Sequence, residues 1–400
     1  MDMKKHLLRL LLPLKYLLLL VSYLIPRNKK IWCFGTSFVG NTKYLFIYMN
    51  EHHKDIRCIW IANKKDYNRV KDNGFEVYTR WSFKGIWYGL IGGVYVYNSY
   101  PDNINLYTSG GARFVNLYHG IALKCIDRQI KVGPMTKIYQ SRGVINELRY
   151  LNFRLLPDVV LSTSPANTKQ YVEAFGVDES HFIEGLYPRC VLFNEKLDLV
   201  ENFIGKYEGV KALDLARYIK RFDYSYIYMP TFRDTGDNFI IKCGFDFDRL
   251  NELMKKKNRL FIMKLHPDST FQFKHDYSNV ILIDKDIDIY PILPFTNCLI
   301  TDYSSIYCDY ILMRGKQTIL FIPDYNDYIT KSRELAYDYD EVMKGPRVST
   351  FEELVTLLNI DNANVNIEGL DDVRHLFWDY SVTTMSDLVG AINERLKIRS

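Results

Sequence analysis

Two histidines lie where short apolar segments of the chain end. His119 follows the run "ARFVNLY" and precedes Gly120, and His266 follows "LFIMKL" and precedes Pro267. An imidazole has an unperturbed pKa of about 6.5, so it exchanges a proton readily near neutral pH. At the end of a strand, such a ring would suit a general base, or a protonated donor to a phosphate oxygen. The alternative for each histidine is an ordinary structural hydrogen bond in a turn.

Hydroxyl and carboxylate side chains gather in the stretch "CLITDYSSIYCDYILM". Thr301 and Asp302 end a strand-like pattern, and Ser304 and Ser305 begin a helix-like one. Residues of these types cap the N-terminus of a helix. The free backbone N–H groups and the positive dipole end at the same place also favour a phosphate. The stretch therefore predicts either an N-cap alone or a diphosphate site built on one.

Three arginines adjoin turns that follow apolar segments. Arg233 comes two residues after Thr231 in "YMPTFRD", and Arg189 and Arg347 each follow a proline. The planar guanidinium matches the geometry of a phosphate, so these arginines are candidate ligands of an anionic substrate. The alternatives are an ion pair between Arg233 and Asp234, and a plain surface position for the other two.

The candidate side chains follow strands in a repeating strand–helix order. Strand patterns alternate with helical ones in both halves of the chain, and a charged helical stretch separates the halves. This order is typical of parallel βαβ units. Ligands of such sheets bind at the carboxyl ends of the strands, which is where the polar residues lie. The sequence therefore predicts an α/β fold of two Rossmann-like domains facing a cleft.

The predicted organisation has five parts, whose boundaries follow changes in the pattern. They are an amphipathic helix at 1–28, a first Rossmann-like domain at 29–205, a helical connector at 206–223, a second Rossmann-like domain at 224–368, and C-terminal helices at 369–400 that pack back across the domains.

The N-terminal segment "MDMKKHLLRLLLPLKYLLLLVSYLIPRNKK" is rich in leucine and basic residues. Its longest uncharged run, residues 16–26, is shorter than the roughly 20 apolar residues that span a bilayer. On a helical wheel, Lys4, Lys5, Arg9 and Lys15 fall within an arc of about 140°, which leaves a broad leucine face. This pattern favours a helix lying in the plane of an anionic membrane surface. A signal peptide and a buried core helix are the alternatives.

Composition narrows the range of partners. A net charge of +5 is mildly basic, which suits anionic substrates, and no nucleic-acid-binding motif accompanies it. The seven cysteines lie far apart and form no C-x-x-C pair. This predicts reduced thiols, with neither a disulfide framework nor a zinc site. The D-x-D letters of "YDYDE" fall in a loop-like stretch and do not predict a metal site. We expect no metal and no cofactor.

Several motifs occur in an order that resembles a known family. They are "NLYHGIALK", "EGLYPRC", "YMPTFRD", "KLHP", "LITDYSSIYCDY" with "FIPDYNDY", and "GPRVSTFEEL", spread over residues 30–365. Together they resemble the CDP-glycerol glycerophosphotransferases of teichoic acid and capsule synthesis. The resemblance implies a glycosyltransferase-B-like fold and a peripheral enzyme on the cytoplasmic face of the cell membrane. It also implies transfer of glycerol phosphate from CDP-glycerol to a lipid-linked saccharide acceptor, with release of CMP.

The resemblance assigns roles to the residues that match these motifs. It implies that His119 is the catalytic base and that His266 is its partner on the phosphates. The first domain becomes the acceptor domain, and the second becomes the CDP-donor domain. The residues expected to bind substrate are Gly120, Arg189, Thr231, Arg233, Thr301, Asp302, Ser304, Ser305 and Arg347.

Two positions depart from the pattern of the family. Phe232 replaces the usual tryptophan of the P-T-W-R-D motif, and Ile121 and Ala122 replace the usual Thr-Pro after His-Gly. The first change is mild because an aromatic ring is kept. The second concerns the acceptor side of the pocket.

Three other functions fit the same sequence. CDP-ribitol would serve as the donor if the few contacts to the alcohol allow it. A glycosyltransferase of similar fold would use a nucleotide sugar instead. A catalytically silent membrane-bound assembly module belongs to a different class, and the presence of both His119 and His266 argues against it.

Overall fold

The computed structural model describes residues 12–35, 37–131, 136–141, 143–233, 239–266, 269–325, 328, 334–360 and 367–398. The contacts between residues divide the chain into two compact units. Unit 1 contains residues 1–119, 135–189 and 380–400, and unit 2 contains residues 120–134 and 190–379. The chain therefore passes from unit 1 to unit 2 directly after His119, and again directly after Arg189.

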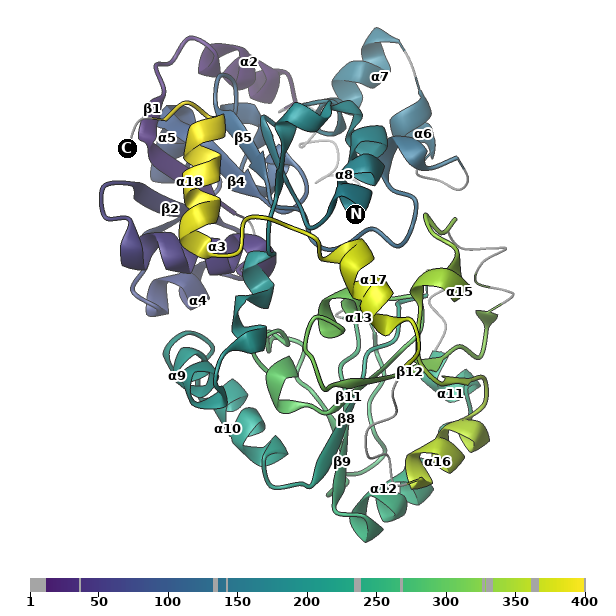
Figure 1. Cartoon of the computed structure of the whole chain (residues 1–400). Helices are drawn as coiled ribbons and strands as arrows, with labels where there is room; N and C mark the ends of the chain where they lie inside the picture. The colour runs from purple at the N-terminus through teal and green to yellow at the C-terminus, as the bar shows by residue number, and fades with distance from the viewer. Residues whose placement is uncertain are drawn as a thin grey trace. The chain divides into compact units, whose positions relative to one another are not determined.

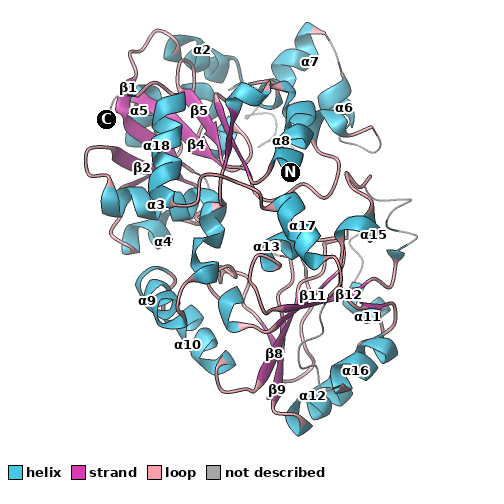
Figure 2. Cartoon of the chain, viewed as in Figure 1, coloured by secondary structure: helices cyan, strands magenta, loops and turns pink. Residues whose placement is uncertain are grey.

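Unit 1 is built on a seven-stranded sheet. The strands lie in the order β3-β2-β1-β4-β5-β6-β7, and neighbouring strands are parallel. Figures 1 and 2 label strands β1, β2, β4 and β5 of this sheet. Nearly continuous apolar runs form the central strands because helices cover both faces of a parallel sheet. The strands are β1 (Asn28–Phe34), β2 (Arg57–Ala62), β3 (Val77–Thr79), β4 (Gly92–Tyr97), β5 (Arg113–Asn116), β6 (Val159–Ser162) and β7 (Phe182–Glu184).

Two helices of unit 1 begin where the sequence supplies a serine cap. Ser82 accepts a hydrogen bond from the Gly85 N–H, and Ser164 accepts one from the Asn167 N–H, next to a proline at the first turn. The helices of unit 1 are α2 (Leu12–Ser22), α3 (Gly40–His52), α4 (Tyr67–Asp72), α5 (Phe83–Ile91), α6 (Thr136–Gln140), α7 (Val144–Arg149), α8 (Pro165–Tyr171) and α18 (Met385–Arg395).

Unit 2 is built on a six-stranded parallel sheet in the order β10-β9-β8-β11-β12-β13. The strands are β8 (Tyr224–Tyr228), β9 (Arg259–Met263), β10 (Val280–Leu282), β11 (Cys298–Thr301), β12 (Gln317–Phe321) and β13 (Arg347–Val348). The helices are α9 (Leu197–Tyr207), α10 (Val210–Ile219), α11 (Phe239–Lys242), α12 (Phe247–Lys256), α13 (Ile306–Tyr310), α15 (Tyr339–Val342), α16 (Phe351–Asn359) and α17 (Leu370–Phe377).

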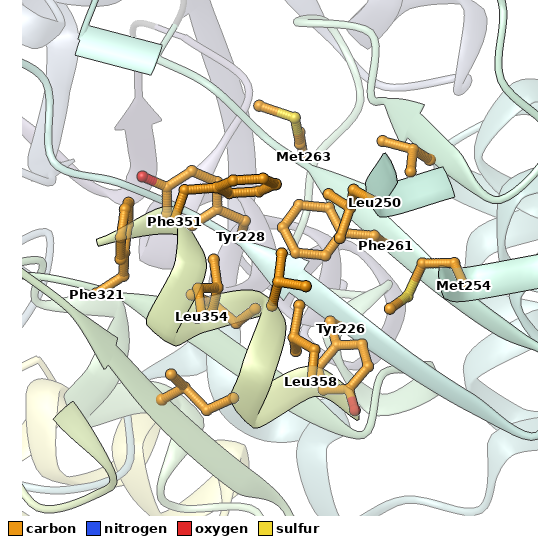
Figure 3. Close-up of a cluster of buried hydrophobic side chains, with 14 of the residues drawn as sticks. Tyr226, Tyr228, Leu250, Met254, Phe261, Met263, Phe321, Phe351, Leu354 and Leu358 are labelled. Atoms are coloured by element: carbon orange, nitrogen blue, oxygen red, sulfur yellow. The ribbon is translucent and has the colours of Figure 1, made fainter. Parts of the chain in front are cut away.

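The core of unit 2 packs helices α12 and α16 against the sheet. A capping box starts α16: Thr350 accepts the Glu353 N–H, and the Glu353 carboxylate accepts the Thr350 N–H. Figure 3 shows apolar side chains of both helices meeting those of the strands, and the fully buried contributors include Tyr226, Tyr228, Leu250, Met254, Phe261, Met263, Leu354 and Leu358.

Each sheet has one point at which the strand order reverses. This point lies between β1 and β4 in unit 1, and between β8 and β11 in unit 2. Open parallel sheets bind their ligands outside the carboxyl ends of the strands at such a point. The described residues that leave these ends are 35, 37–39 and 98–100 in unit 1, and 229–233 and 302–305 in unit 2. A ligand is therefore expected at these loops.

The predicted α/β fold with two parallel sheets is confirmed. The structure describes only part of the predicted helix at 1–28, because residues 1–11, with Lys4, Lys5 and Arg9, lie outside the described residues. Helix α2 forms part of the described segment 12–28. Within the described ranges, no helix has the length and apolar character needed to cross a bilayer.

The compact units are defined by contacts between residues, whereas the predicted domain boundaries were placed by the order of strand and helix patterns along the chain. Residues 190–223 belong to unit 2, and residues 380–400 belong to unit 1. The C-terminal segment joins unit 1 because Val382 pairs with the end of β7, where its N–H donates to the Glu184 carbonyl at 3.2 Å. The segment after His119 joins unit 2 because the Cys125 N–H donates to the Glu334 carbonyl at 2.9 Å. The predicted boundaries at 205, 223 and 368 stay a prediction about folding units.

Candidate active site

His119 is carried by a turn at the carboxyl end of β5. Tyr118 has a φ of 51°, a conformation that costs a residue with a side chain roughly 1–2 kcal/mol. Asn116 accepts the Tyr118 N–H at 3.0 Å, and the Tyr118 ring packs edge-to-face on Tyr171 at 4.9 Å. Gly120 has a φ of 142°, which glycine adopts easily. These contacts hold the turn in one conformation.

The imidazole of His119 faces the end of the neighbouring strand β4. Its Nδ1 lies 3.3 Å from the Asn98 carbonyl oxygen and 3.3 Å from the Ser99 hydroxyl. When Nδ1–H donates to the carbonyl, Nε2 is the nitrogen without a proton. This is the tautomer that a general base needs.

The environment keeps the His119 ring neutral. The residue retains exposed surface, yet desolvation by the surrounding protein is the largest cause that lowers its pKa to about 4. The hydrogen bond to the Asn98 carbonyl acts in the opposite direction, and the Arg189 guanidinium lowers the pKa further. The imidazole is therefore unprotonated at pH 7.

Arg189 is attached to the same turn. Its side chain is buried, and Nη1 donates to the His119 carbonyl oxygen at 2.6 Å. Its backbone N–H donates to Asn41 Oδ1 at 3.2 Å. The structure thus brings His119 and Arg189 together, with Gly120 next along the chain.

Arg233 is the centre of a buried ion-pair cluster in unit 2. Its Nη2 lies 2.8 Å from Asp302 Oδ2, its Nε donates to Asp324 Oδ2 at 2.8 Å, and its Nη1 donates to the Thr231 carbonyl at 2.6 Å. Asp302 has no exposed surface and also accepts the Thr231 N–H at 2.9 Å. One guanidinium therefore joins the loops that follow β8, β11 and β12.

The charge of this cluster changes how Arg233 is interpreted. Burial alone would lower the pKa of Arg233, but Asp302 and Asp324 together raise it, so the cation is permanent. Two carboxylates face one guanidinium, which leaves no surplus positive charge for a phosphate. The ion pair between Arg233 and Asp234, which was the alternative from the sequence, stays a prediction because residue 234 lies outside the described residues.

Two threonines complete the strand ends of this cluster. The Thr301 hydroxyl, which is buried, donates to the Met229 carbonyl at 2.7 Å and so ties β11 to β8. The Thr231 hydroxyl oxygen is also buried, and it has no hydrogen-bond partner among the described residues. Thr301 is therefore a structural residue in this arrangement, while Thr231 presents an unsatisfied hydroxyl at the candidate site.

Ser304 and Ser305 lie between this cluster and α13. Both are half-buried. Ser305 holds the N-cap position with a φ of −64° and a ψ of −12°, and its side chain makes no capping hydrogen bond. The predicted cap is wrong at Ser305, because an N-cap side chain reaches the helix N–H groups from an extended backbone rather than a helical one.

His266 and Phe232 meet at the ends of the paired strands β9 and β8. Their ring centroids lie 4.7 Å apart with an interplanar angle of 33°. His266 is exposed. The aromatic residue of the P-T-F-R-D motif thus supports the second candidate histidine.

Arg347 approaches the Arg233 cluster through one tyrosine. The guanidinium lies 5.2 Å from the centre of the Tyr339 ring, and the Tyr339 hydroxyl donates to the Asp302 carbonyl at 3.1 Å. Arg347 is also paired with Asp340. Across the part of the chain that the structure describes, no group of three or more His, Cys, Asp or Glu side chains could hold a metal ion.

A family model described as CDP-glycerol:poly(glycerophosphate) glycerophosphotransferase matches residues 20–389. The chain belongs to this family. It is therefore a transferase, and the recognition made from the six motifs is confirmed.

Relatives of this glycerophosphotransferase differ in polyol and in length. A teichoic acid poly(glycerol phosphate) polymerase of Bacillus spizizenii is 23% identical over 84% of this chain and 84% of its own length. A teichoic acid poly(ribitol-phosphate) polymerase of the same species is 30% identical over 61% of this chain and 37% of its own length. A teichoic acid glycerol-phosphate transferase of Staphylococcus aureus is 25% identical, with 84% of each chain covered. The chain thus spans most of some relatives and under half of others.

Solved structures show the same fold. One structure of the wall teichoic acid polymerase TagF is 21% identical, with a TM-score of 0.74 over 98% of this chain and 97% of that one. A UDP-GlcNAc 2-epimerase from Methanocaldococcus jannaschii is 10% identical, with a TM-score of 0.56 over 91% of this chain and 99% of that one.

Sequence reasoning missed three residues of the candidate site. Asp324 follows the apolar run "TILFIP", so the rule that polar residues gather at strand ends would have found it. Asn98 follows the apolar run "VYVY", so the same rule would have found it. Asn41 gave no such signal, because asparagine is common at helix starts whatever its function.

Proposed function

We propose that this glycerophosphotransferase moves glycerol phosphate from CDP-glycerol to a hydroxyl of a lipid-linked saccharide and releases CMP, in the synthesis of a teichoic-acid-like or capsular polymer. The observation that carries the proposal is the His119 imidazole at the end of β5, with Nδ1 3.3 Å from the Asn98 carbonyl oxygen, in a chain of this family. Nε2 of His119 accepts the proton of the acceptor hydroxyl. The hydroxyl oxygen bonds to the β-phosphorus, the bond from that phosphorus to the bridging oxygen breaks, and CMP leaves.

The lowered pKa of His119 has a cost in this mechanism. A ring with a pKa of about 4 is fully neutral at pH 7 but is a weak base. The bound diphosphate brings negative charge to the reaction centre, and a nearby anion favours the protonated imidazole. His119 therefore becomes a stronger base when the donor is present, and it stays unprotonated before the donor arrives.

The proposed donor site is at the strand reversal of unit 2. Thr231, Ser304, Ser305 and His266 follow the strands there, and they are the residues proposed to meet a diphosphate. Arg233 supports the site by fixing the loops that present them. Arg347, which is paired with Asp340, lies beside Tyr339.

A membrane location is supported by an exposed apolar surface of unit 1. In α2, Leu17 and Leu20 are 55% and 65% exposed, and in α7, Val144 and Ile145 are 77% and 74% exposed. The two helices are joined, because the Tyr16 hydroxyl donates to the Leu148 carbonyl at 2.6 Å. We call these two helices the α2–α7 surface.

The α2–α7 surface continues into the region before α5. The Lys15 ammonium lies 5.1 Å from the centre of the Trp81 ring, and Trp81 and Phe83 are 49% and 85% exposed. Leucine, valine and aromatic side chains beside a lysine are the composition of a surface that lies on anionic lipid. We propose that this surface holds the enzyme on the cytoplasmic face of the membrane as a peripheral protein.

The reaction is tested by the release of CMP. Purified protein is mixed with detergent-dispersed lipid extract and either CDP-glycerol or CDP-ribitol. We expect CMP from CDP-glycerol, and a loss of at least ~100-fold in His119→Ala, the scale of a lost general base. Release of CMP from CDP-ribitol alone would show that the donor is CDP-ribitol, whose polyol is that in the name of the 30%-identical relative. Release from neither donor by folded protein would overturn the proposal.

A further inference from the structure

Asn41 connects the two parts of the candidate site in unit 1. It is the second residue of α3 and has no exposed surface. Its Nδ2 donates to the Leu117 carbonyl at 3.0 Å and to the Tyr118 carbonyl at 2.9 Å. Its Oδ1 accepts the Arg189 N–H at 3.2 Å. One side-chain amide therefore ties down the turn that carries His119 and the backbone of Arg189.

The turn needs this support because its backbone is strained. Tyr118 has a φ of 51°, and such a conformation persists only where surrounding contacts determine it. The carbonyl groups of Leu117 and Tyr118 point toward the protein interior, where an unpaired carbonyl is costly. Asn41 supplies both with a donor. Without this amide, we expect the backbone of the turn before His119 to take another conformation.

Asn41 is itself held at a fixed place. The first turn of α3 is tied to the end of β4, since Asn98 Oδ1 accepts the Thr42 N–H at 3.1 Å and Asn98 Nδ2 donates to the Thr42 hydroxyl at 2.9 Å. The Asn98 carbonyl lies 3.3 Å from His119 Nδ1. The start of α3 therefore acts on His119 in two ways. Asn98, which is tied to α3, contacts the imidazole ring, and Asn41 holds the main chain before it.

We propose that Asn41 is a positioning residue that sets the direction of the His119 imidazole and keeps Arg189 against the His119 carbonyl. It has no exposed surface and acts through the turn that carries His119. The consequence for turnover rests on the proposed function, but the consequence for the geometry of His119 does not. These two consequences are measured separately.

The test compares two buried asparagines. Asn41→Asp keeps the acceptor for the Arg189 N–H and replaces the donor to the two carbonyls by a second oxygen, which repels them. The control is Asn279→Asp in unit 2. Asn279 is also buried, its Nδ2 donates to the Arg259 carbonyl at 2.9 Å, and it lies at the amino ends of β9 and β10. If Asn41→Asp does not fold, Asn41→Ala removes the two donor bonds, and also the acceptor for the Arg189 N–H, without adding a charge.

Two readouts are taken on folded protein with histidine labelled by ¹³C. The first is the Cε1–H signal of His119, assigned by its loss in His119→Gln. We expect its shift or titration midpoint to change in the Asn41 variant and to stay unchanged in Asn279→Asp. The second is the kinetics of CMP release. We expect kcat to fall at least ~10-fold with KM for CDP-glycerol within ~3-fold, because a displaced base affects turnover rather than donor binding.

The outcomes separate the two proposals. An unchanged His119 signal in folded Asn41 variants overturns the positioning role, whatever the activity. A changed signal with normal kcat in an active enzyme supports the positioning of the ring but overturns its consequence for turnover. If the wild-type protein releases CMP from neither donor, the proposed function fails, and the His119 signal alone decides whether Asn41 positions the ring.

Discussion

Arg233 and Asp302 hold each other through both the side chain and the backbone of one loop. The guanidinium lies 2.8 Å from the Asp302 carboxylate, and the same carboxylate accepts the N–H of Thr231, whose carbonyl accepts the Arg233 Nη1. This closed arrangement fixes the tip of β8 to the tip of β11. A guanidinium that is used in this way organises the loops at the proposed donor site. It does not offer a free fork to the phosphate.

The first prediction concerns this cluster. The Arg233 guanidinium binds Asp302, Asp324 and the Thr231 carbonyl. In Arg233→Lys a single ammonium cannot bind all three, because it lacks the planar fork. We expect the free energy of unfolding to fall by about 3 kcal/mol, the scale of a broken buried ion pair, and KM for the donor to rise at least ~10-fold. Denaturant unfolding and steady-state kinetics measure the two effects. Unchanged stability would show that the cluster does not hold the loops.

Arg249→Lys is the matched control for this change. Arg249 pairs with Glu352 at the surface of unit 2, where the two side chains are 47% and 68% exposed. Surface pairs contribute little, so we expect the denaturant midpoint to stay at its wild-type value.

The second prediction concerns Phe232. Its ring supports His266 at 4.7 Å and is 36% exposed, so its removal leaves the core intact. We expect Phe232→Ala to raise KM for the donor at least ~10-fold with little loss of stability, and Phe232→Trp to keep activity. Kinetics with thermal unfolding of both variants test this. Equal activity in the alanine variant would show that the ring does not position His266.

The third prediction concerns the α2–α7 surface. Leu17→Glu with Leu20→Glu replaces two exposed apolar side chains by charges, and each buried leucine contributes about 1.5–3 kcal/mol to membrane binding. We expect the fraction that floats with anionic phospholipid vesicles to fall at least ~10-fold. Val210→Glu in α10, a residue 73% exposed in unit 2, is the matched control. Loss of dimers rather than loss of vesicle binding would make this surface an interface between two copies.

The sequence allowed the fold and the location of the candidate site to be predicted, because both follow from local signals. Apolar runs that end in polar residues marked the strand ends at His119, Thr231, His266 and Thr301. The partners of these residues could not be predicted. Whether a guanidinium faces a phosphate or a carboxylate depends on which loops meet. Asp324, 91 positions from Arg233 in the chain, comes to it only through the order of strands in the sheet.

The fourth prediction concerns stability and pH. The pKa of His119 is lowered to about 4 in the folded protein, against about 6.5 in the unfolded chain. Between these pH values the unfolded chain binds more protons than the folded protein. The contribution of His119 to the free energy of unfolding is therefore fully present above about pH 6.5 and is lost as the pH is lowered toward about 4. His119→Gln should make the stability less dependent on pH in this window. Denaturant midpoints at pH 7, 6 and 5 for both proteins measure it. Parallel losses in both proteins would contradict the assignment to His119.

The last prediction separates the charge of Arg189 from its hydrogen bond to the His119 carbonyl. The guanidinium disfavours a protonated imidazole, so its removal should raise the pKa of His119 toward its ordinary value. In Arg189→Gln we expect the acid limb of kcat/KM, which reports ionisations of the free enzyme, to move to higher pH. In Arg189→Lys the positive charge is kept, so the limb should stay near its wild-type position even though the planar fork is lost. Equal movement in both variants would show that geometry sets the ionisation of His119, and no movement in Arg189→Gln would show that the cation does not contribute to it.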